Sequence, residues 1–253
     1  MIDHTSLTQL AQNLEIDTFT VMREYLQIQF LEQIYKDQRF VKTYFKGGTC
    51  LRLVYKSSRF SEDLDFTTSL PIHSLAEILD ETIKKLANEF IQLSWREVKS
   101  LQGFSAKLYF PVDFARQPLT VKLDFSQRES VIEPSTSPIE TSLPVGGVNL
   151  VEHLSAREIG AEKVRALLHR DKGRDVFDLW YILHKNFSLD VSLILRKLKF
   201  YHEPYDKHRL VEKIENLSEK DILQDLQRFV PKSERKILPH LKRLLLAQVE
   251  EKL

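Results

Sequence analysis

Two short segments of the chain carry the residue types that nucleotide chemistry needs. The first is Lys46-Gly47-Gly48-Thr49, in which a glycine pair follows a β-rich run and precedes a helical pattern. Backbone N–H groups at such a turn, together with a hydroxyl, can hold phosphate oxygens. The second is Asp63-Leu64-Asp65, whose two carboxylates can hold a divalent metal. Together the two segments predict a site for a nucleoside triphosphate and magnesium.

The spacing of the two aspartates gives them a common orientation. Asp63 and Asp65 lie two residues apart on a predicted strand, so their side chains project from the same face. Leu64 and Phe66 then face the core. Two such carboxylates repel each other unless a cation or protons lie between them, and magnesium with a triphosphate meets that need. An ordinary solvated strand face is the alternative interpretation of an isolated Asp-x-Asp pair.

A third carboxylate follows in the alternating strand Leu119–Phe125. Leu123 and Phe125 face the core in this pattern, so Asp124 faces the other way, with Lys122. If this strand neighbours the Asp63 strand, Asp124 becomes the third ligand of the metal site. If it does not, Asp124 is an exposed strand residue.

The glycine turn also has a structural interpretation. Gly47 and Gly48 can end a strand, and Thr49 can cap the helix that follows. Both roles use the same geometry as phosphate binding, so they do not exclude it. Lys46 either adds positive charge to the phosphate site or merely flanks it.

The hydrophobic pattern divides the chain into two parts. Before residue 150 it predicts helices over residues 15–39, 49–55 and 73–90, strands over 41–45, 64–67, 104–110 and 119–125, and a loop-rich stretch over 126–150. After residue 150 it predicts a helix capped by Ser155, then helices over 175–185, 190–199, 207–217, 218–229 and 233–252, with a break at Pro239. The fold class is therefore α+β or α/β, with a mixed sheet flanked by helices over residues 1–150 and an all-helical domain over residues 151–253.

Positive charge gathers early in the helical part. Lys163, Arg165, Arg170, Lys172 and Arg174 lie close together in a chain whose net charge is +1, which suits a triphosphate or an RNA backbone. Asp175 and Asp178 follow directly. Their structural interpretation is that Asp175 caps the next helix and Asp178 occupies its third position.

Composition limits the remaining possibilities. Hydrophobic residues make up 42% and charged residues 29% of the 253, which is typical of a soluble globular protein. The apolar runs are too short to span a bilayer, and no signal peptide precedes them. Cys50 is the single cysteine, which excludes an internal disulfide and favours a cytoplasmic location. The near-neutral charge argues against a general nucleic-acid coat protein.

These motifs carry a family resemblance. Lys46 to Thr49, a short helix, and then Arg59-x-Ser61-x-Asp63-Leu-Asp65-Phe resemble the motif of AbiEii-type nucleotidyltransferase toxins, which belong to the DNA polymerase β-like superfamily. A Lys on one helix and an Arg-Asp-x-x-Asp segment opening the next, as at Lys163 and Arg174-Asp175, resemble a second motif of that family. The resemblance implies one or two Mg²⁺ ions at Asp63, Asp65 and Asp124. It implies that Lys163 contacts the nucleotide phosphates, with Arg174 among the nucleotide-binding residues, and that Asp175 completes the catalytic set.

The resemblance also implies a function. It predicts a toxin of a toxin–antitoxin pair, linked to phage defence by abortive infection. The toxin would transfer a nucleoside monophosphate from a triphosphate to an acceptor, in related proteins the 3′ end of tRNA, and release pyrophosphate. The helical domain would complete the active-site cleft, and an antitoxin would be a partner.

Two other classes of function stay open. A non-catalytic nucleotide-binding regulator would lack a competent Lys163 or Asp175, and both are present. A phosphotransferase acting on a protein would need a base on a catalytic loop and a glycine-rich flap, and the sequence offers neither.

Overall fold

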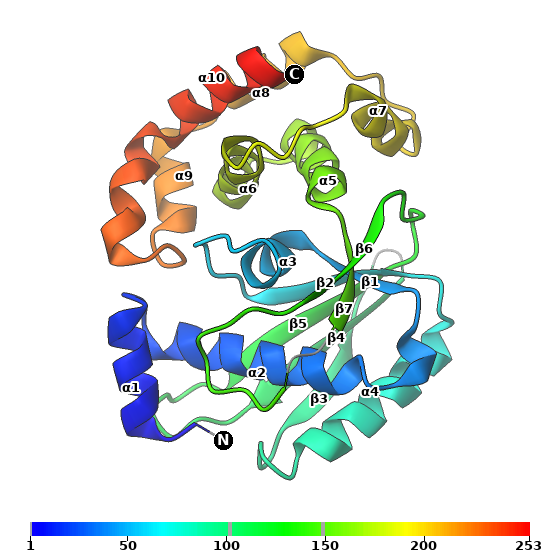
Figure 1. Ribbon diagram of the computed structural model, residues 1–253, viewed down its shortest axis with the longest axis vertical. Helices are drawn as coiled ribbons and strands as arrows, with labels where there is room; N and C mark the ends of the chain where they lie inside the picture. The colour runs from blue at the N-terminus through cyan, green and yellow to red at the C-terminus, as the bar shows by residue number, and fades with distance from the viewer. Residues whose placement is uncertain (1, 101–102, 148–149) are drawn as a thin grey trace. The chain divides into compact units, whose positions relative to one another are not determined.

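The computed structural model describes residues 2–100, 103–147 and 150–253. The chain divides into two compact units, one consisting of Met1–Lys56 and Phe60–His153, the other of Ser57–Arg59 and Leu154–Leu253. The first unit combines a β-sheet with helices, and the second is built from helices (Figure 1). This arrangement confirms the predicted α+β fold. No helix in the described part of the chain is both long and apolar enough to cross a membrane.

One mixed sheet organises the first unit. Seven strands of the described residues lie in the order β3-β4-β5-β2-β1-β7-β6. β1 is antiparallel to β2 and parallel to β7, β2 is parallel to β5, and β4 is antiparallel to both β3 and β5. The strands are β1 (Thr43–Lys46), β2 (Asp63–Thr68), β3 (Ser94–Val98), β4 (Phe104–Phe110), β5 (Leu119–Ser126), β6 (Pro134–Pro138) and β7 (Leu150–Leu154). The mixed strand directions agree with the sheet predicted from the sequence.

The helix predicted over residues 15–39 is shorter in the structure. α2 begins after Asp17, whose carboxylate accepts the Thr20 N–H as an N-cap, and it ends at Ile34. A separate 3₁₀ turn then follows. The helical elements of this unit are α1 (His4–Asn13), α2 (Thr18–Ile34), η1 (Gln38–Phe40), α3 (Gly47–Leu53) and α4 (Ile72–Leu86).

Side-chain alternation along β2 and β5 gives the sheet one apolar face and one polar face. Leu64, Phe66, Leu123 and Phe125 are fully buried, and the Phe66 and Phe125 rings stack with their centroids 4.9 Å apart. α2 packs against α4 and β5 and covers this face (Figure 1). The residues that alternate with these four buried side chains along β2 and β5 project from the opposite face of the sheet. The candidate site residues of both strands lie on that face.

The stretch predicted to be loop-rich, residues 126–150, contains more regular structure than expected. Pro134 and Pro138 are the end residues of β6, which is an edge strand of the sheet. Proline has no N–H to donate to a neighbouring strand, and an edge strand tolerates this because one of its sides has no partner strand. β7 begins at Leu150 and pairs with β1 through Phe45 and His153. Residues 148–149 of this stretch lie outside the described residues.

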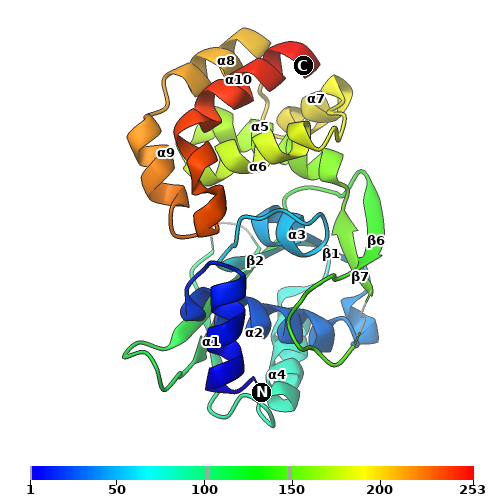
Figure 2. The same ribbon diagram turned by 60° about the vertical axis from the view of Figure 1, so that its left-hand side comes forward.

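The second unit is helical, as predicted. Ser155 accepts the Glu158 N–H, which confirms it as the N-cap of α5. Pro239 lies in a 3₁₀ segment, and the last α-helix begins only at Leu241, so the predicted break is present. α10 packs against α6 and α8, and Figure 2 shows α8 and α10 side by side. The helices are α5 (Ala156–His169), α6 (Gly173–His184), α7 (Val191–Lys199), α8 (Lys207–Glu215), α9 (Glu219–Leu226), η2 (Lys232–His240) and α10 (Leu241–Lys252).

Candidate active site

The glycine turn joins β1 directly to α3. Gly47 has a φ of +77°, in the left-handed region where a side chain is strained. A Cβ on Gly47 would also lie 2.3 Å from Asp65 Oδ2. The absence of a side chain here therefore lets the turn approach the Asp65 carboxylate.

Thr49 connects the turn to the carboxylate strand. It lies inside α3, which begins at Gly47, so the expectation that Thr49 caps the helix is wrong; Lys46 holds the N-cap position without a side-chain bond. The buried Thr49 hydroxyl instead donates to the main-chain carbonyl of Asp63. Its proton is thereby committed to fixing β2 against α3. The main-chain N–H groups of the first turn lack intrahelical partners and are the donors that remain for an anion.

Three carboxylates lie on one face of neighbouring strands. Asp63 and Asp65 alternate with the buried Leu64 on β2. β5 pairs with β2, and Asp124 stands directly opposite Asp65 in the register. The strand neighbour on which the prediction for Asp124 depended is thus present. Lys46 stands opposite Asp65 on the other side, from β1.

A lysine supplies positive charge to these carboxylates. The Lys122 ammonium lies 2.8 Å from Asp124 Oδ2, and Lys122 stands opposite Asp63 in the register. Burial acts to lower the pKa of Lys122, yet the pKa is raised because Asp124 accepts its hydrogen bond and Asp63 and Asp65 add negative charge. The carboxylates therefore create a potential that favours a cation. Nowhere in the described residues, however, do three or more His, Cys, Asp or Glu side chains gather closely enough to hold a metal ion.

The second unit contains a buried ionic network. Lys163 Nζ lies 2.9 Å from Asp175 Oδ1 and 2.8 Å from Asp178 Oδ2. Arg59 donates two hydrogen bonds to Asp178, at 2.8 and 2.9 Å, and Arg170 donates to Asp175 at 2.7 Å. The side chains of both aspartates are only 1% exposed. Each carboxylate thus has two cationic partners.

Charge rather than burial sets the ionisation of this network. Burial alone would raise the pKa of Asp175, but Lys163 and Arg170 hold it well below the usual range. The pKa of Asp178 is lowered in the same way, against burial, by Arg59 and Lys163. The two aspartates in turn raise the pKa of Lys163 despite its burial. All three groups are therefore charged at neutral pH.

Two of these positions differ from the sequence interpretation. Lys172 is the N-cap of α6, and Asp175 lies within the first turn, so the predicted capping role is wrong. Asp178 lies one turn further on and pairs with Arg59 instead of occupying the third position. Arg59 belongs to the first motif, but the sequence pattern assigns it no role. Its residue type and its place in the motif are the only features of the sequence that could have indicated a role. Its pairing with Asp178 depends on tertiary contacts.

The candidate residues belong to both units. Lys46, Gly47, Gly48, Thr49, Asp63, Asp65 and Asp124 lie in the first, and Lys163, Arg174 and Asp175 lie in the second. Arg174 is half-buried in the first turn of α6. A common role for the two sets stays a prediction.

Comparison with known proteins decides the family. The family model described as "Nucleotidyl transferase AbiEii toxin, Type IV TA system" matches residues 29–248, most of the chain. The chain belongs to the AbiEii nucleotidyltransferase toxin family. It is therefore a nucleotidyltransferase, and the family is the toxin of a type IV toxin–antitoxin system, which implies a nucleotide substrate and a cognate antitoxin. All candidate residues lie within the matched region of this AbiEii-family protein.

Solved structures share the AbiEii-family fold seen here. MenT4, a nucleotidyltransferase toxin from Mycobacterium tuberculosis, aligns with a TM-score of 0.67 at 18% identity, covering 99% of this chain and 90% of that one. JHP933 from Helicobacter pylori aligns with a TM-score of 0.57 at 20% identity, covering 93% of this chain and 95% of that one. At these identities the likeness shows the fold. No curated protein matches the chain.

The glycine turn gives a first prediction for this AbiEii-family enzyme. Gly47→Ala should lower the free energy of unfolding by about 1–2 kcal/mol, because an L-residue is strained at this φ. Transfer activity should fall much more, by about 100-fold, because the new Cβ displaces the Asp65 carboxylate and small misplacements at a reacting site are costly. Urea unfolding and initial rates measure the two effects. Gly146→Ala is the control, since its Cβ would meet nothing within 4 Å, and an equal loss of activity there would contradict the argument.

The ionic network gives a prediction for acid stability. Because the pKa of Asp175 is lower in the folded protein than in the unfolded chain, its stabilisation is present above the unfolded value of about 4 and is lost as the pH falls below that. Arg170→Gln removes one cause of the low pKa and should move the acid-unfolding midpoint to higher pH. Circular dichroism between pH 7 and pH 2 measures the midpoint. Lys213→Gln, which breaks the exposed pair with Asp171, should leave it nearly unchanged.

Proposed function

We propose that the enzyme transfers a nucleoside monophosphate from a nucleoside triphosphate to the 3′ end of tRNA, with Mg²⁺, and releases pyrophosphate. The observation that carries the proposal is the register of β2 and β5, which sets Asp63, Asp65 and Asp124 on one face beside the Gly47 turn. Such a transfer needs donors for phosphate oxygens and carboxylates for a divalent ion.

The ligand chemistry of the donor set fits magnesium, and the three carboxylates would have to draw closer together around the ion. Magnesium prefers oxygen ligands, and Asp63, Asp65 and Asp124 supply them where the potential already favours a cation. Magnesium bound by these residues would neutralise charge on the triphosphate and orient it. Lys122 then has to leave Asp124, which its half-exposed side chain allows.

The chain's own residues hold the reacting groups. Main-chain N–H groups at Gly47, Gly48 and Thr49 bind the triphosphate oxygens, and Lys46 and Arg174 add positive charge. The acceptor hydroxyl oxygen forms a bond to the α-phosphorus, the bond to the pyrophosphate group breaks, and the hydroxyl proton is lost to solvent. Lys163 offsets the negative charge that develops on the phosphates.

The role of Asp175 follows from its ionisation. A carboxylate with a pKa held this low by Lys163 and Arg170 is a weak base. Its ion pair with Lys163 instead holds the ammonium in place, and its ion pair with Arg170 holds the carboxylate. We therefore propose that Asp175 orients Lys163 and does not remove the acceptor proton.

The test is a transfer assay. The purified protein is incubated with Mg²⁺, each α-labelled nucleoside triphosphate in turn and total tRNA, and the RNA is resolved on a gel. Label on tRNA from one nucleotide supports the proposal and gives the base preference. Label on the protein alone, or no label on RNA with any nucleotide, would contradict the tRNA acceptor.

A parallel reaction tests transfer of the terminal phosphate. With γ-labelled triphosphate the proposal predicts labelled pyrophosphate and unlabelled protein. Labelled protein together with release of the diphosphate would identify a phosphotransferase instead. A toxin role is tested by expressing the chain in bacteria with and without the neighbouring gene, and growth arrest relieved by that gene is the expected result.

A further inference from the structure

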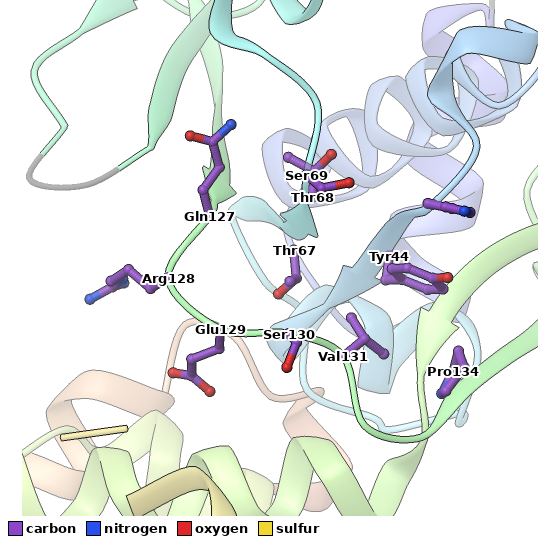
Figure 3. A pocket seen from close by; sticks show the side chains of 11 residues that line it. Tyr44, Thr67, Thr68, Ser69, Gln127, Arg128, Glu129, Ser130, Val131 and Pro134 are labelled. Carbon is purple, nitrogen blue, oxygen red and sulfur yellow. The ribbon is translucent and has the colours of Figure 1, made fainter. Parts of the chain in front are cut away.

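A cavity of about 630 Å³ opens in the first unit, at the end of β2 opposite to Asp63 (Figure 3). Its walls come from the start of β1, the end of β2 and the loop after β5, including Tyr44, Thr67, Ser69, Gln127, Ser130 and Val131. The volume is in the range of small-molecule sites. No step of the proposed reaction involves this cavity.

The cavity and the carboxylates share one face of the sheet. Tyr44 stands opposite Thr67 in the register. The pair formed by Lys46 and Asp65 lies two residues away along each strand. Side chains two apart on a strand project from the same face, about 7 Å apart. Thr67 therefore lies one row beyond Asp65 on the same strand. A molecule held at the carboxylates can reach the cavity along this face.

Thr67 is the feature that points to a ligand. The residue is 4% exposed, and its hydroxyl has no hydrogen-bond partner among the described residues. The neighbouring Thr68 hydroxyl, by contrast, pairs with Thr43 at 2.8 Å and accepts the Leu70 N–H. A buried hydroxyl without a partner is destabilising, so its retention is explained by a group that completes the bond.

The lining favours an uncharged polar ligand. Of the eleven residues that line the cavity only Lys42, Arg128 and Glu129 carry charge. Figure 3 shows Tyr44, Thr67 and Ser130 around the same space. A tyrosine ring beside hydroxyl groups suits a flat heterocycle joined to a sugar, since the ring offers a stacking surface and the hydroxyls offer hydrogen bonds.

We propose that this cavity binds a nucleoside, with the Thr67 hydroxyl bonded to its base or ribose and Tyr44 against the base. The inference rests on the proposed function, because it assigns a place to the nucleoside part of a reacting nucleotide. That nucleoside belongs either to the triphosphate or to the terminal residue of the acceptor.

The first test measures binding without catalysis. The four nucleoside 5′-monophosphates are titrated into the full-length protein by calorimetry, without metal or tRNA. At least one should bind, and Thr67→Val should weaken that binding by roughly three- to tenfold, the worth of one neutral hydrogen bond. The stability of the variant should be unchanged or higher, because the unpaired hydroxyl is gone. A threonine with only a structural role would not give this combination of lower affinity and unchanged or higher stability.

Two further variants make the test decisive. Thr43→Val also removes one buried hydroxyl from the same sheet, but one that is bonded to Thr68 and does not line the cavity, so it should leave nucleotide affinity unchanged. Val131→Trp fills the cavity from its loop and should abolish binding. The proposal would be overturned if the wild type, Thr67→Val and Val131→Trp bound the monophosphates with equal affinity. It would also be overturned if the wild type bound no monophosphate.

Kinetics then separate the two sources of the nucleoside. A raised KM for the triphosphate in Thr67→Val, with the KM for tRNA unchanged, assigns the cavity to the triphosphate. The reverse pattern assigns it to the acceptor. Monophosphate binding that depends on Thr67 in a protein without transferase activity on tRNA would refute the proposed function while supporting the cavity assignment, so the two failures are distinguishable.

Discussion

Asp65→Asn should abolish nucleotide transfer while leaving the protein folded. Asp65 stands between Lys46 and Asp124 in the register and touches the Gly47 turn, so its carboxylate is central to the proposed metal site. Losing one metal ligand removes several kcal/mol of transition-state stabilisation, which corresponds to a rate at least about 10³-fold lower. The free energy of unfolding should change by less than about 1 kcal/mol, because the half-buried Asp65 faces other carboxylates that repel it.

The assay compares initial rates of label transfer with urea unfolding curves for the same preparations. Asp113→Asn is the matched control, since Asp113 is an exposed aspartate of the same unit, and its rate should equal that of the wild type. Chelation of divalent ions should reproduce the loss in the wild type, and added Mg²⁺ should restore the rate. Full activity in Asp65→Asn, or in the chelated enzyme, would refute the metal role of these carboxylates.

The second large effect is on stability. Asp178→Ala should lower the free energy of unfolding by about 3–5 kcal/mol, because it removes a carboxylate that pairs with two buried cations. Asp178 and Arg59 have side chains 1% and 2% exposed, and Lys163 loses one of its two carboxylate partners. The loss should also lower the pKa of Lys163, since burial disfavours its charged form and Asp178 is the larger opposing influence.

Chemical unfolding followed by circular dichroism measures this change. Asp171→Ala, which breaks an exposed ion pair with Lys213 in the same unit, should cost less than about 1 kcal/mol. Replacing Arg59 and Asp178 together by Met and Leu should recover part of the loss, because the buried charge of Arg59 is then removed together with that of Asp178. Similar effects of Asp178→Ala and Asp171→Ala would show that the buried network contributes little.

Local sequence patterns determined much of this protein. A period of two residues placed Asp63 and Asp65 on one face of β2 and Leu64 on the other, because side chains alternate along any strand. Ser155 was identifiable as a cap, and Pro239 as a break, because both act on the backbone within one turn. The glycine turn and the two motifs were enough to indicate the family.

Tertiary structure decided the relations between distant segments. Asp124 lies beside Asp65 only because β5 pairs with β2, and a strand pattern does not name its neighbour. Arg59 and Asp178 are far apart in the chain, and each looks like a surface residue by type until folding buries both and pairs them. The strands β6 and β7 escaped prediction because pairing with neighbouring strands, rather than an alternating pattern in their own short sequences, holds them extended. The cavity lined by Thr67 forms where three segments of the chain come together, so no single stretch of sequence could have revealed it.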